Sequence, residues 1–153
     1  MISISQIDRG KQSSNLFRLK NMSPLVSLVT IAALLVLLTV TLNVGRLRVK
    51  FGIKAPQMTG DPDFERAVRV HQNTLEQIVI FLPALWIFAQ FVQPIAAASL
   101  GTIWVSGRIF YAWGYYQAAE KRGPGFGISF LATVILLLGS IGGIGMQLSK
   151  SIG

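Results

Sequence analysis

Long apolar runs separated by short polar segments make up most of the chain after about residue 23. Four such segments follow one another, at about residues 24–44, 62–92, 94–121 and 127–148. Each is about as long as the roughly 20 residues that an α-helix needs to cross a bilayer. The pattern predicts an all-α integral membrane protein, a four-transmembrane-helix bundle, with one membrane domain over residues 23–150.

Proline and glycine mark the expected ends of these helices. Three of the four helices are expected to begin at a proline, namely Pro24, Pro62 and Pro94, because the first helical position needs no backbone N–H. The segment Gly123-Pro124-Gly125 predicts a break before the fourth helix. Residues 1–22 are polar and mildly basic without apolar periodicity, which predicts a flexible polar tail.

The second helix differs from the others because its first half is polar. Its uninterrupted apolar run, Ile78–Val92, has 15 residues and is too short to cross a bilayer alone. The helix therefore carries part of the polar stretch Phe64–Gln77 into the membrane. A polar or charged group in lipid costs several kcal/mol unless it faces protein or water. We expect this stretch to line a cavity between neighbouring helices.

Two polar stripes emerge when successive residues are turned by about 100° along a helix. The first stripe, on the second helix, contains Glu65, Arg69, Asn73 and Glu76, with Arg66 beside it and His71 pointing roughly away. The second stripe, on the third helix, contains Arg108, Tyr111, Tyr115 and Arg122. Both stripes head toward the same membrane face, so we expect them to face one another.

Each of these residues also has a plain structural interpretation. Glu65 and Arg69 are spaced as an i,i+4 ion pair, and Arg122 is placed as a headgroup anchor. Such anchors need not align on two facing stripes. Arg108 and Glu76 lie deepest in apolar sequence, and we expect them to pair with other charged groups inside the bundle. Glu65, Arg66 and Arg108 are assigned structural polar roles.

Charge and composition narrow the class of function. The chain has 153 residues, of which 52% are hydrophobic and 13% charged, with a formal net charge of +8. The basic residues lie in the tail, in the loop at residues 45–60 and at later helix ends rather than in a soluble domain. This distribution argues against nucleic acid as a partner. It predicts that the first and third interhelical loops face the cytoplasm.

The residue inventory excludes several kinds of chemistry. The chain has no cysteine and one histidine, so it offers no disulfide, no thiolate metal site and no cysteine nucleophile, and we expect no metal. Arginines bind carboxylates through two parallel hydrogen bonds. Together with an asparagine, a glutamate and tyrosine hydroxyls, they suit a small zwitterion with more carboxylates than amines. A site at the membrane face would let that ligand meet an apolar partner dissolved in lipid.

The segments TGDPDFERAVRVHQNTLEQIVIFLPALW and RIFYAWGYYQAAEKR resemble the MAPEG family, the membrane-associated proteins of eicosanoid and glutathione metabolism. The similarity is greatest to the microsomal glutathione transferase subgroup that includes the leukotriene-forming transferase, and it covers about residues 24–148. The resemblance implies a homotrimer with glutathione, the cosubstrate, bound between neighbouring subunits at the cytoplasmic side.

The resemblance also implies roles for individual residues. It assigns glutathione binding to seven of them: Arg48, Arg69, His71, Asn73, Glu76, Tyr111 and Tyr115. It assigns catalysis to Arg122, as the arginine that holds the glutathione sulfur as a thiolate. Two positions depart from the leukotriene-forming enzyme: Gln77 replaces a tyrosine, and Val49 stands in place of a second arginine. The second departure argues against assuming leukotriene synthesis.

The function that follows is a membrane glutathione transferase that conjugates the glutathione thiolate to lipophilic electrophiles and also reduces lipid hydroperoxides. Membrane lipid is the expected surroundings. The alternative is a non-catalytic lipid-binding member of the same family, which is expected to lack the thiolate-stabilising arginine. A third interpretation, a basic membrane anchor or assembly subunit, predicts no glutathione binding at all.

Overall fold

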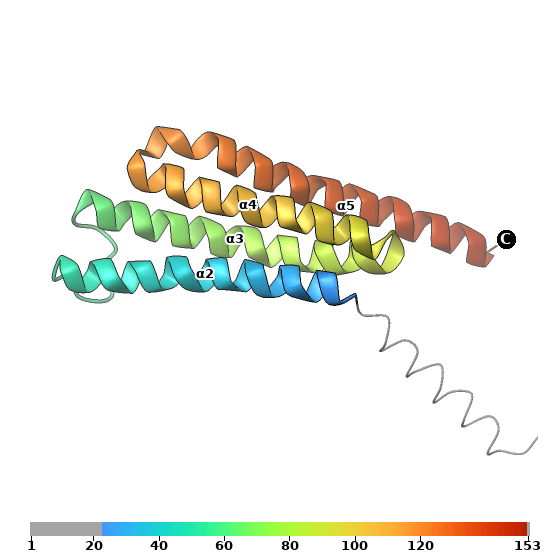
Figure 1. Cartoon of the computed structure of the whole chain (residues 1–153), viewed down its shortest axis with the longest axis horizontal. Coiled ribbons are helices and arrows are strands. Elements are labelled where there is room, and N and C mark those ends of the chain that lie inside the picture. Colours follow the sequence, from blue (N-terminus) through green and yellow to red (C-terminus); the bar gives the residue numbers. More distant parts are fainter. Residues whose placement is uncertain (1–22, 153) are drawn as a thin grey trace, which may run out of the picture.

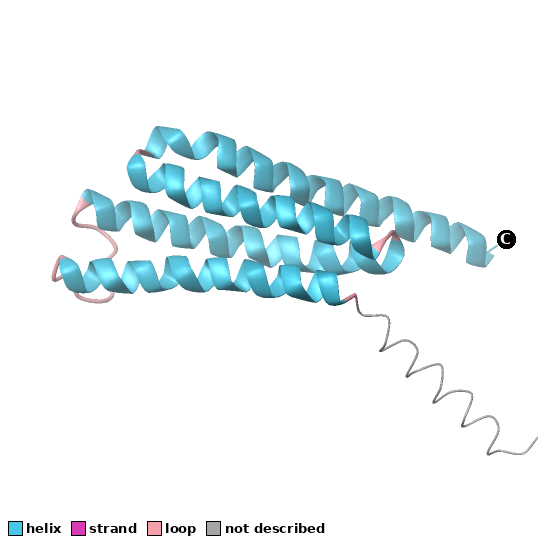
Figure 2. Ribbon diagram, in the orientation of Figure 1, coloured by secondary structure: helices cyan, strands magenta, loops and turns pink. Residues whose placement is uncertain are grey.

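The computed structural model describes residues 23–152, and the predicted flexible tail lies outside this range. The elements are α2 (Pro24–Lys50), α3 (Pro62–Phe91), α4 (Pro94–Gln117), the short 3₁₀ helix η1 (Ala119–Arg122) and α5 (Gly123–Ile152). Between residues 23 and 152 there is no strand (Figure 2). Four helical segments are long and apolar enough to cross a membrane. The predicted all-α, four-helix membrane fold is therefore confirmed.

The helices run up and down in chain order, so helices that follow one another are antiparallel (Figure 1). The α2–α3 and α4–α5 connections lie at one end of the bundle. The two-residue connection Val92–Gln93 lies at the other end, together with residue 23. The first end holds the charged residues between Arg46 and Arg69 and between Glu120 and Arg122. We call it the charged end.

Helix boundaries differ from the apolar pattern at the charged end. An end near residue 44 is wrong for α2, which continues to Lys50 and carries Arg46 and Arg48 on its last turns. Arginine and lysine are good helix formers and suit the negative C-terminal end of the helix dipole. The predicted basic loop is thus helical over its first residues.

The break between α4 and α5 lies at Ala118, before the predicted position at Gly123-Pro124-Gly125. α4 ends at Gln117 rather than near residue 121, and the chain is extended at Ala118. Gly123-Pro124-Gly125 begins α5 instead of separating the helices, because a proline is tolerated in the first turn of a helix. Arg122 therefore lies on η1, between two helices, rather than on the end of α4.

Glycines bring α4 and α5 into backbone contact. A Cβ on Gly125 would overlap the backbone N of Tyr111, and a Cβ on Gly107 would lie 2.8 Å from the backbone N of Ser129. Only a residue without a side chain fits at these two points. The crossing fixes the position of Tyr111 relative to the start of α5.

The uncharged half of the bundle is held by apolar contacts of α3. Phe81 of α3 stacks on Trp104 of α4 with ring centroids 4.0 Å apart and an interplanar angle of 4°, and both side chains are fully buried. One heptad further along α3, a Cβ on Gly139 of α5 would collide with the Phe88 ring. These contacts hold α3 against both α4 and α5, and with it the polar first half of that helix.

Candidate functional site

A row of alternating arginine and tyrosine side chains follows α4 from the bundle interior to the charged end. The Arg108 Cζ lies 4.1 Å from the centroid of the Tyr111 ring. Tyr111 meets Tyr115 edge to face, with ring centroids 5.6 Å apart, and the Arg122 Cζ lies 5.3 Å from the Tyr115 centroid. The structure thus brings the whole predicted second stripe together, and we call these four residues the α4 row.

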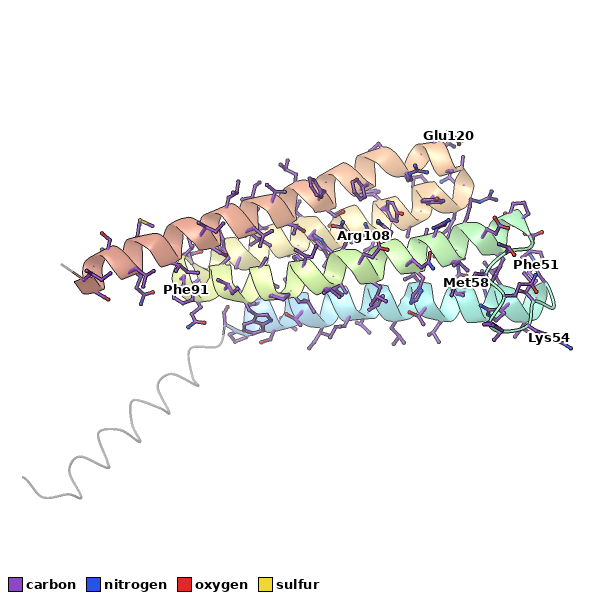
Figure 3. The ribbon with its side chains drawn as sticks, turned by 180° about the vertical axis from the view of Figure 1, so that it is seen from behind. Phe51, Lys54, Met58, Phe91, Arg108 and Glu120 are labelled. Atoms are coloured by element: carbon purple, nitrogen blue, oxygen red, sulfur yellow. The ribbon has the colours of Figure 1, made fainter. Side chains whose placement is uncertain are left out.

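Arg108 is the inner end of the α4 row and is fully buried. Its Nη1 donates to Asn73 Oδ1 (3.1 Å) and its Nη2 donates to Thr74 Oγ1 (2.7 Å), as its place between α3 and α4 in Figure 3 suggests. Within residues 23–152 it forms no salt bridge. The expectation that Arg108 pairs with a charged group is therefore wrong, because two neutral oxygens from α3 accept from its guanidinium.

Arg122 is the outer end of the α4 row and is exposed. Its Nη1 donates to the Ala119 carbonyl oxygen at 3.3 Å, and its Cζ lies over the Tyr115 ring. An arginine has five N–H donors, so most of its donors remain available to a ligand. This geometry presents a positive charge at the charged end of the bundle, next to a half-buried tyrosine hydroxyl.

The first stripe, on α3, divides between the interior and the outer surface. Asn73 turns inward to Arg108, whereas Arg69 and Glu76 are exposed and His71 is half-buried. The expected pairing of Glu76 inside the bundle is not formed within this chain either, because its side chain is exposed and makes no salt bridge between residues 23 and 152. The two stripes meet at the Asn73–Arg108 contact. Arg69 and Glu76 lie within about 60° of Asn73 around α3, but their side chains are exposed.

The remaining predicted residues contact the α2–α3 connection. Arg48 Nη1 donates to the Gln57 carbonyl oxygen at 2.7 Å, and its Cζ lies 5.0 Å from the Phe64 ring centroid. Glu65 Oε1 accepts from the Gly60 backbone N–H at 2.9 Å, and Arg66 forms a salt bridge with Asp63. Glu65 and Arg66 therefore order the start of α3, and Glu65 forms no i,i+4 ion pair with Arg69 within the described residues. Within this chain, Arg48 is not next to the α4 row.

Two features of the α4 row escape sequence reasoning. Thr74 accepts a second hydrogen bond from Arg108, but the pattern did not single it out, because a threonine among apolar residues is common in membrane helices. Phe126 of α5 packs on Tyr111, with ring centroids 6.3 Å apart, and no pattern in the chain signals it. Only the position of Thr74, directly after the polar Asn73, could have indicated in the sequence that it bonds to Arg108.

The fold and the polar row define a multi-pass α-helical membrane protein with a cationic, tyrosine-lined end. The model of the MAPEG family matches residues 26–142. The chain belongs to the MAPEG family.

Three relatives indicate its place in that family. Uncharacterized protein sll1147 of Synechocystis sp. is 51% identical over 124 residues, covering 81% of this chain and 90% of the relative. Microsomal glutathione S-transferase 2 of Homo sapiens is 39% identical over 102 residues, covering 66% and 69%. Leukotriene C4 synthase of Cavia porcellus is 30% identical over 125 residues, covering 81% and 83%. The predicted resemblance is confirmed.

Proposed function

We propose that the protein conjugates glutathione to lipophilic electrophiles at the charged end of the bundle. The observation that carries this proposal is Arg122, an exposed guanidinium held on Tyr115 at the outer end of the α4 row. The names of two relatives, a microsomal glutathione S-transferase and a leukotriene C4 synthase, support glutathione as the cosubstrate. They also make a non-catalytic lipid-binding role the less favoured interpretation.

The proposed chemistry uses the thiol of glutathione and no nucleophile of the protein. A free thiol has a pKa of about 8.5 and is mostly protonated at neutral pH. A guanidinium within about 4–6 Å stabilises the thiolate and lowers that pKa by about one to three units. The thiolate attacks an electrophilic carbon, a C–S bond forms, and the leaving group departs with the electron pair of the broken bond.

The same thiolate accounts for the proposed peroxidase reaction. Attack on an oxygen of a lipid hydroperoxide breaks the O–O bond, and the departing alkoxide takes up a proton and becomes an alcohol. The glutathione sulfur becomes a sulfenic acid, which a second glutathione converts to the disulfide with release of water. The site needs only to hold the thiolate and admit a lipid from the bilayer.

The exposed charges of α3 support the proposal that the protein assembles as a homotrimer. Counting about 20 residues back from Phe91 puts the far hydrocarbon boundary near residue 72, so the exposed Glu76 lies within the membrane. A carboxylate in contact with lipid costs several kcal/mol, whereas a neighbouring chain and its bound ligand would cover it. In such an assembly, glutathione bound between neighbouring chains would contact the predicted binding residues, namely Arg48, Arg69, His71, Asn73, Glu76, Tyr111 and Tyr115.

The orientation of the site follows from the same charge distribution. Within residues 23–152, the connections at the charged end carry Lys54, Lys121 and Arg122, whereas Lys150 is the basic residue near the opposite end. Short basic loops remain on the cytoplasmic side. We therefore propose that the α2–α3 and α4–α5 connections and the glutathione site face the cytoplasm.

The test compares Arg122→Ala with Lys121→Ala in purified protein. Lys121 is the adjacent exposed cation, and its ammonium donates to Gln117 Oε1 at 3.1 Å. Arg122→Ala is expected to retain glutathione binding but to conjugate an aryl halide at least about tenfold more slowly at neutral pH, because the thiol returns to its ordinary pKa. The ultraviolet absorbance of bound thiolate should disappear with it.

Lys121→Ala should leave both the rate and the thiolate absorbance unchanged. Wild-type turnover in Arg122→Ala would exclude Arg122 as the activating charge. Absence of both turnover and thiolate absorbance in the wild-type protein would instead favour the lipid-binding alternative. Repeating the assay with a lipid hydroperoxide tests the peroxidase reaction separately.

A further inference from the structure

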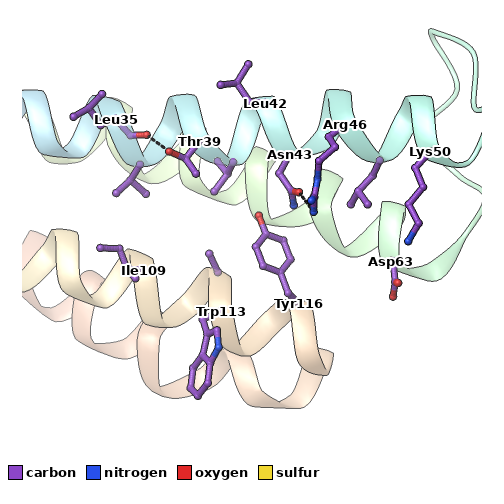
Figure 4. Close-up of a pocket in the computed structure, with 14 residues that line it drawn as sticks. Leu35, Thr39, Leu42, Asn43, Arg46, Lys50, Asp63, Ile109, Trp113 and Tyr116 are labelled. Atoms are coloured by element: carbon purple, nitrogen blue, oxygen red, sulfur yellow. Dashed lines mark hydrogen bonds between the residues drawn. The ribbon is translucent and has the colours of Figure 1, made fainter.

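A second, chemically different site lies between α2 and α4. It is a cleft of about 1010 Å³, shown in Figure 4, and we call it the α2–α4 cleft. None of the predicted glutathione-binding residues and none of the α4 row lines it. The cleft is therefore separate from the proposed glutathione site.

The α2–α4 cleft is apolar along most of its length and polar at one end. Leu35 and Val36 of α2 and Ile109 and Trp113 of α4 line the apolar part. Trp113 is 65% exposed although it lines the cleft, so the cleft opens toward the surface that faces lipid. Its apolar part therefore suits a hydrocarbon chain that enters sideways from the bilayer.

The polar end of the cleft lies at the charged end of the bundle and carries positive charge. Arg46 and Lys50 line it. Asp63 also lines it, but its carboxylate is already paired with Arg66. Arg46 gives one hydrogen bond, from Nη2 to Asn43 Oδ1 at 3.0 Å, which leaves other N–H donors of the guanidinium for a ligand.

A tyrosine hydroxyl at the same end lies next to Asn43. The Tyr116 hydroxyl oxygen is buried and points toward Asn43 and Arg46 (Figure 4), but it makes no hydrogen bond of good geometry in the described part of the chain. Buried polar groups are almost always hydrogen-bonded. A ligand oxygen bound between Tyr116 and the two cations would accept from this hydroxyl.

We propose that the α2–α4 cleft binds an anionic phospholipid of the surrounding bilayer. The phosphate lies between Arg46, Lys50 and the Tyr116 hydroxyl, and an acyl chain lies along the apolar part. Basic pockets between membrane helices recognise anionic headgroups in this way, and arginine pairs with phosphate through two hydrogen bonds. The proposal goes beyond glutathione conjugation and does not depend on it.

Charge complementarity favours a lipid over a second copy of the chain. At the charged end, eight basic residues stand against the four acidic residues Asp61, Asp63, Glu65 and Glu120, and Asp63 and Glu65 are already bound within the chain. A second copy therefore presents a net positive charge to Arg46 and Lys50. A free soluble anion would satisfy the cations but would leave the apolar part empty.

The test uses fluorescence quenching in vesicles of phosphatidylcholine that contain a minor fraction of brominated phosphatidylglycerol or of brominated phosphatidylcholine. The fluorescence of Trp113 is obtained by subtracting the fluorescence of the Trp113→Phe variant from that of the wild-type protein. We expect brominated phosphatidylglycerol to quench it at a much lower fraction than brominated phosphatidylcholine. At about fivefold per basic residue, two cations give a selectivity on the order of 30-fold.

Two variants and a matched control examine the two halves of the cleft. Arg46→Gln with Lys50→Gln should bring the selectivity close to one. Lys54→Gln with Lys121→Gln removes the same charge at the same end but outside the cleft, and should retain the selectivity. Thr39→Phe, which fills the apolar part and keeps both cations, should weaken quenching of Trp113 by phosphatidylglycerol.

Three results would overturn the proposal. The first is equal quenching of the wild-type protein by the two brominated lipids. The second is an equal loss of selectivity in the control variant, because a general surface potential would then explain the preference. The third is protection of Trp113 from both lipids together with disulfide cross-linking between chains of a Thr39→Cys variant, which would place a second copy in the cleft.

Discussion

Helix α4 packs closely against α5 on one side and loosely against α2 on another. Toward α5, Gly107 and Gly125 allow the two backbones to touch, so that even one methyl group would collide. Toward α2, the side chains stay apart and leave a cleft of about 1010 Å³. A single helix thus has one side fixed by backbone contact and another that remains open.

The difference separates two tasks along one helix. The tight side fixes Tyr111 and, through the start of α5, the position of Arg122 at the charged end. The open side holds no residue of the α4 row and leaves room for a lipid. Rigid support for a site and space for a membrane component are therefore compatible on the same element, provided that they lie on different sides of it.

The largest expected effect comes from Gly125→Ala. Its Cβ would overlap the backbone of Tyr111, and backbone atoms cannot move aside as a flexible side chain does. We expect a loss of about 3 kcal/mol, seen as a lower midpoint of thermal unfolding in detergent. Gly127→Ala is the matched control, because a Cβ there meets nothing within 4 Å. Equal midpoints for the two variants would show that α4 and α5 are not in backbone contact.

Arg108→Lys acts on the side of α4 that faces α3, and its effect should be somewhat smaller. One ammonium cannot reproduce the fork that serves both Asn73 and Thr74, so one buried oxygen loses its donor, at a cost of about 1–3 kcal/mol. Thermal unfolding again provides the measurement. The exposed Arg46→Lys should be neutral by comparison, and an unchanged midpoint for Arg108→Lys would mean that its two hydrogen bonds contribute nothing to stability.

Gly139→Ala extends the comparison to α3 and α5, where the neighbour of the new methyl group is the Phe88 ring rather than backbone. A ring can shift, so we expect a loss of about 1 kcal/mol. Gly142→Ala, with nothing within 4 Å, should leave stability unchanged. A loss as large as that of Gly125→Ala would remove the distinction between side-chain and backbone contact.

The smallest effect is expected for Thr39→Leu, on the open side of α4. The side chain is exposed and lines the cleft, so a larger apolar group should change stability by no more than about 0.5 kcal/mol. If the α2 side of α4 is loosely packed, it should accept this larger side chain. A loss similar to that of Gly125→Ala would show that the α2–α4 contact is closely packed after all.

Much of the fold could be predicted from the sequence because hydrophobic length determines which segments can span a membrane. The positions of the helix ends could not. Hydropathy falls at Arg46, but the helix does not end there, since arginine and lysine continue a helix as readily as leucine. Gly123-Pro124-Gly125 is equally compatible with a break and with a helix start. In the structure the chain is extended at Ala118 instead, and α5 begins at Gly123.

The sequence identified the polar residues of the site more readily than their hydrogen-bond partners. Helical spacing placed the α4 row correctly, because all but one of its members lie on one regular helix. It did not reveal that Arg108 bonds to neutral oxygens, since a guanidinium accepts any well-placed acceptor. The α2–α4 cleft was not foreseen either, because it depends on how far apart two helices lie and no local pattern encodes that distance.

The Arg108 contact has a consequence for how the chain enters the membrane. Arg108, Asn73 and Thr74 all belong to α3 and α4, which are joined by the uncharged two-residue connection Val92–Gln93. Such a connection crosses a bilayer at little cost, so the two helices can insert together as a hairpin. The arginine then enters the hydrocarbon region already hydrogen-bonded, before α5 is synthesised. Its two hydrogen bonds therefore do not depend on the last helix.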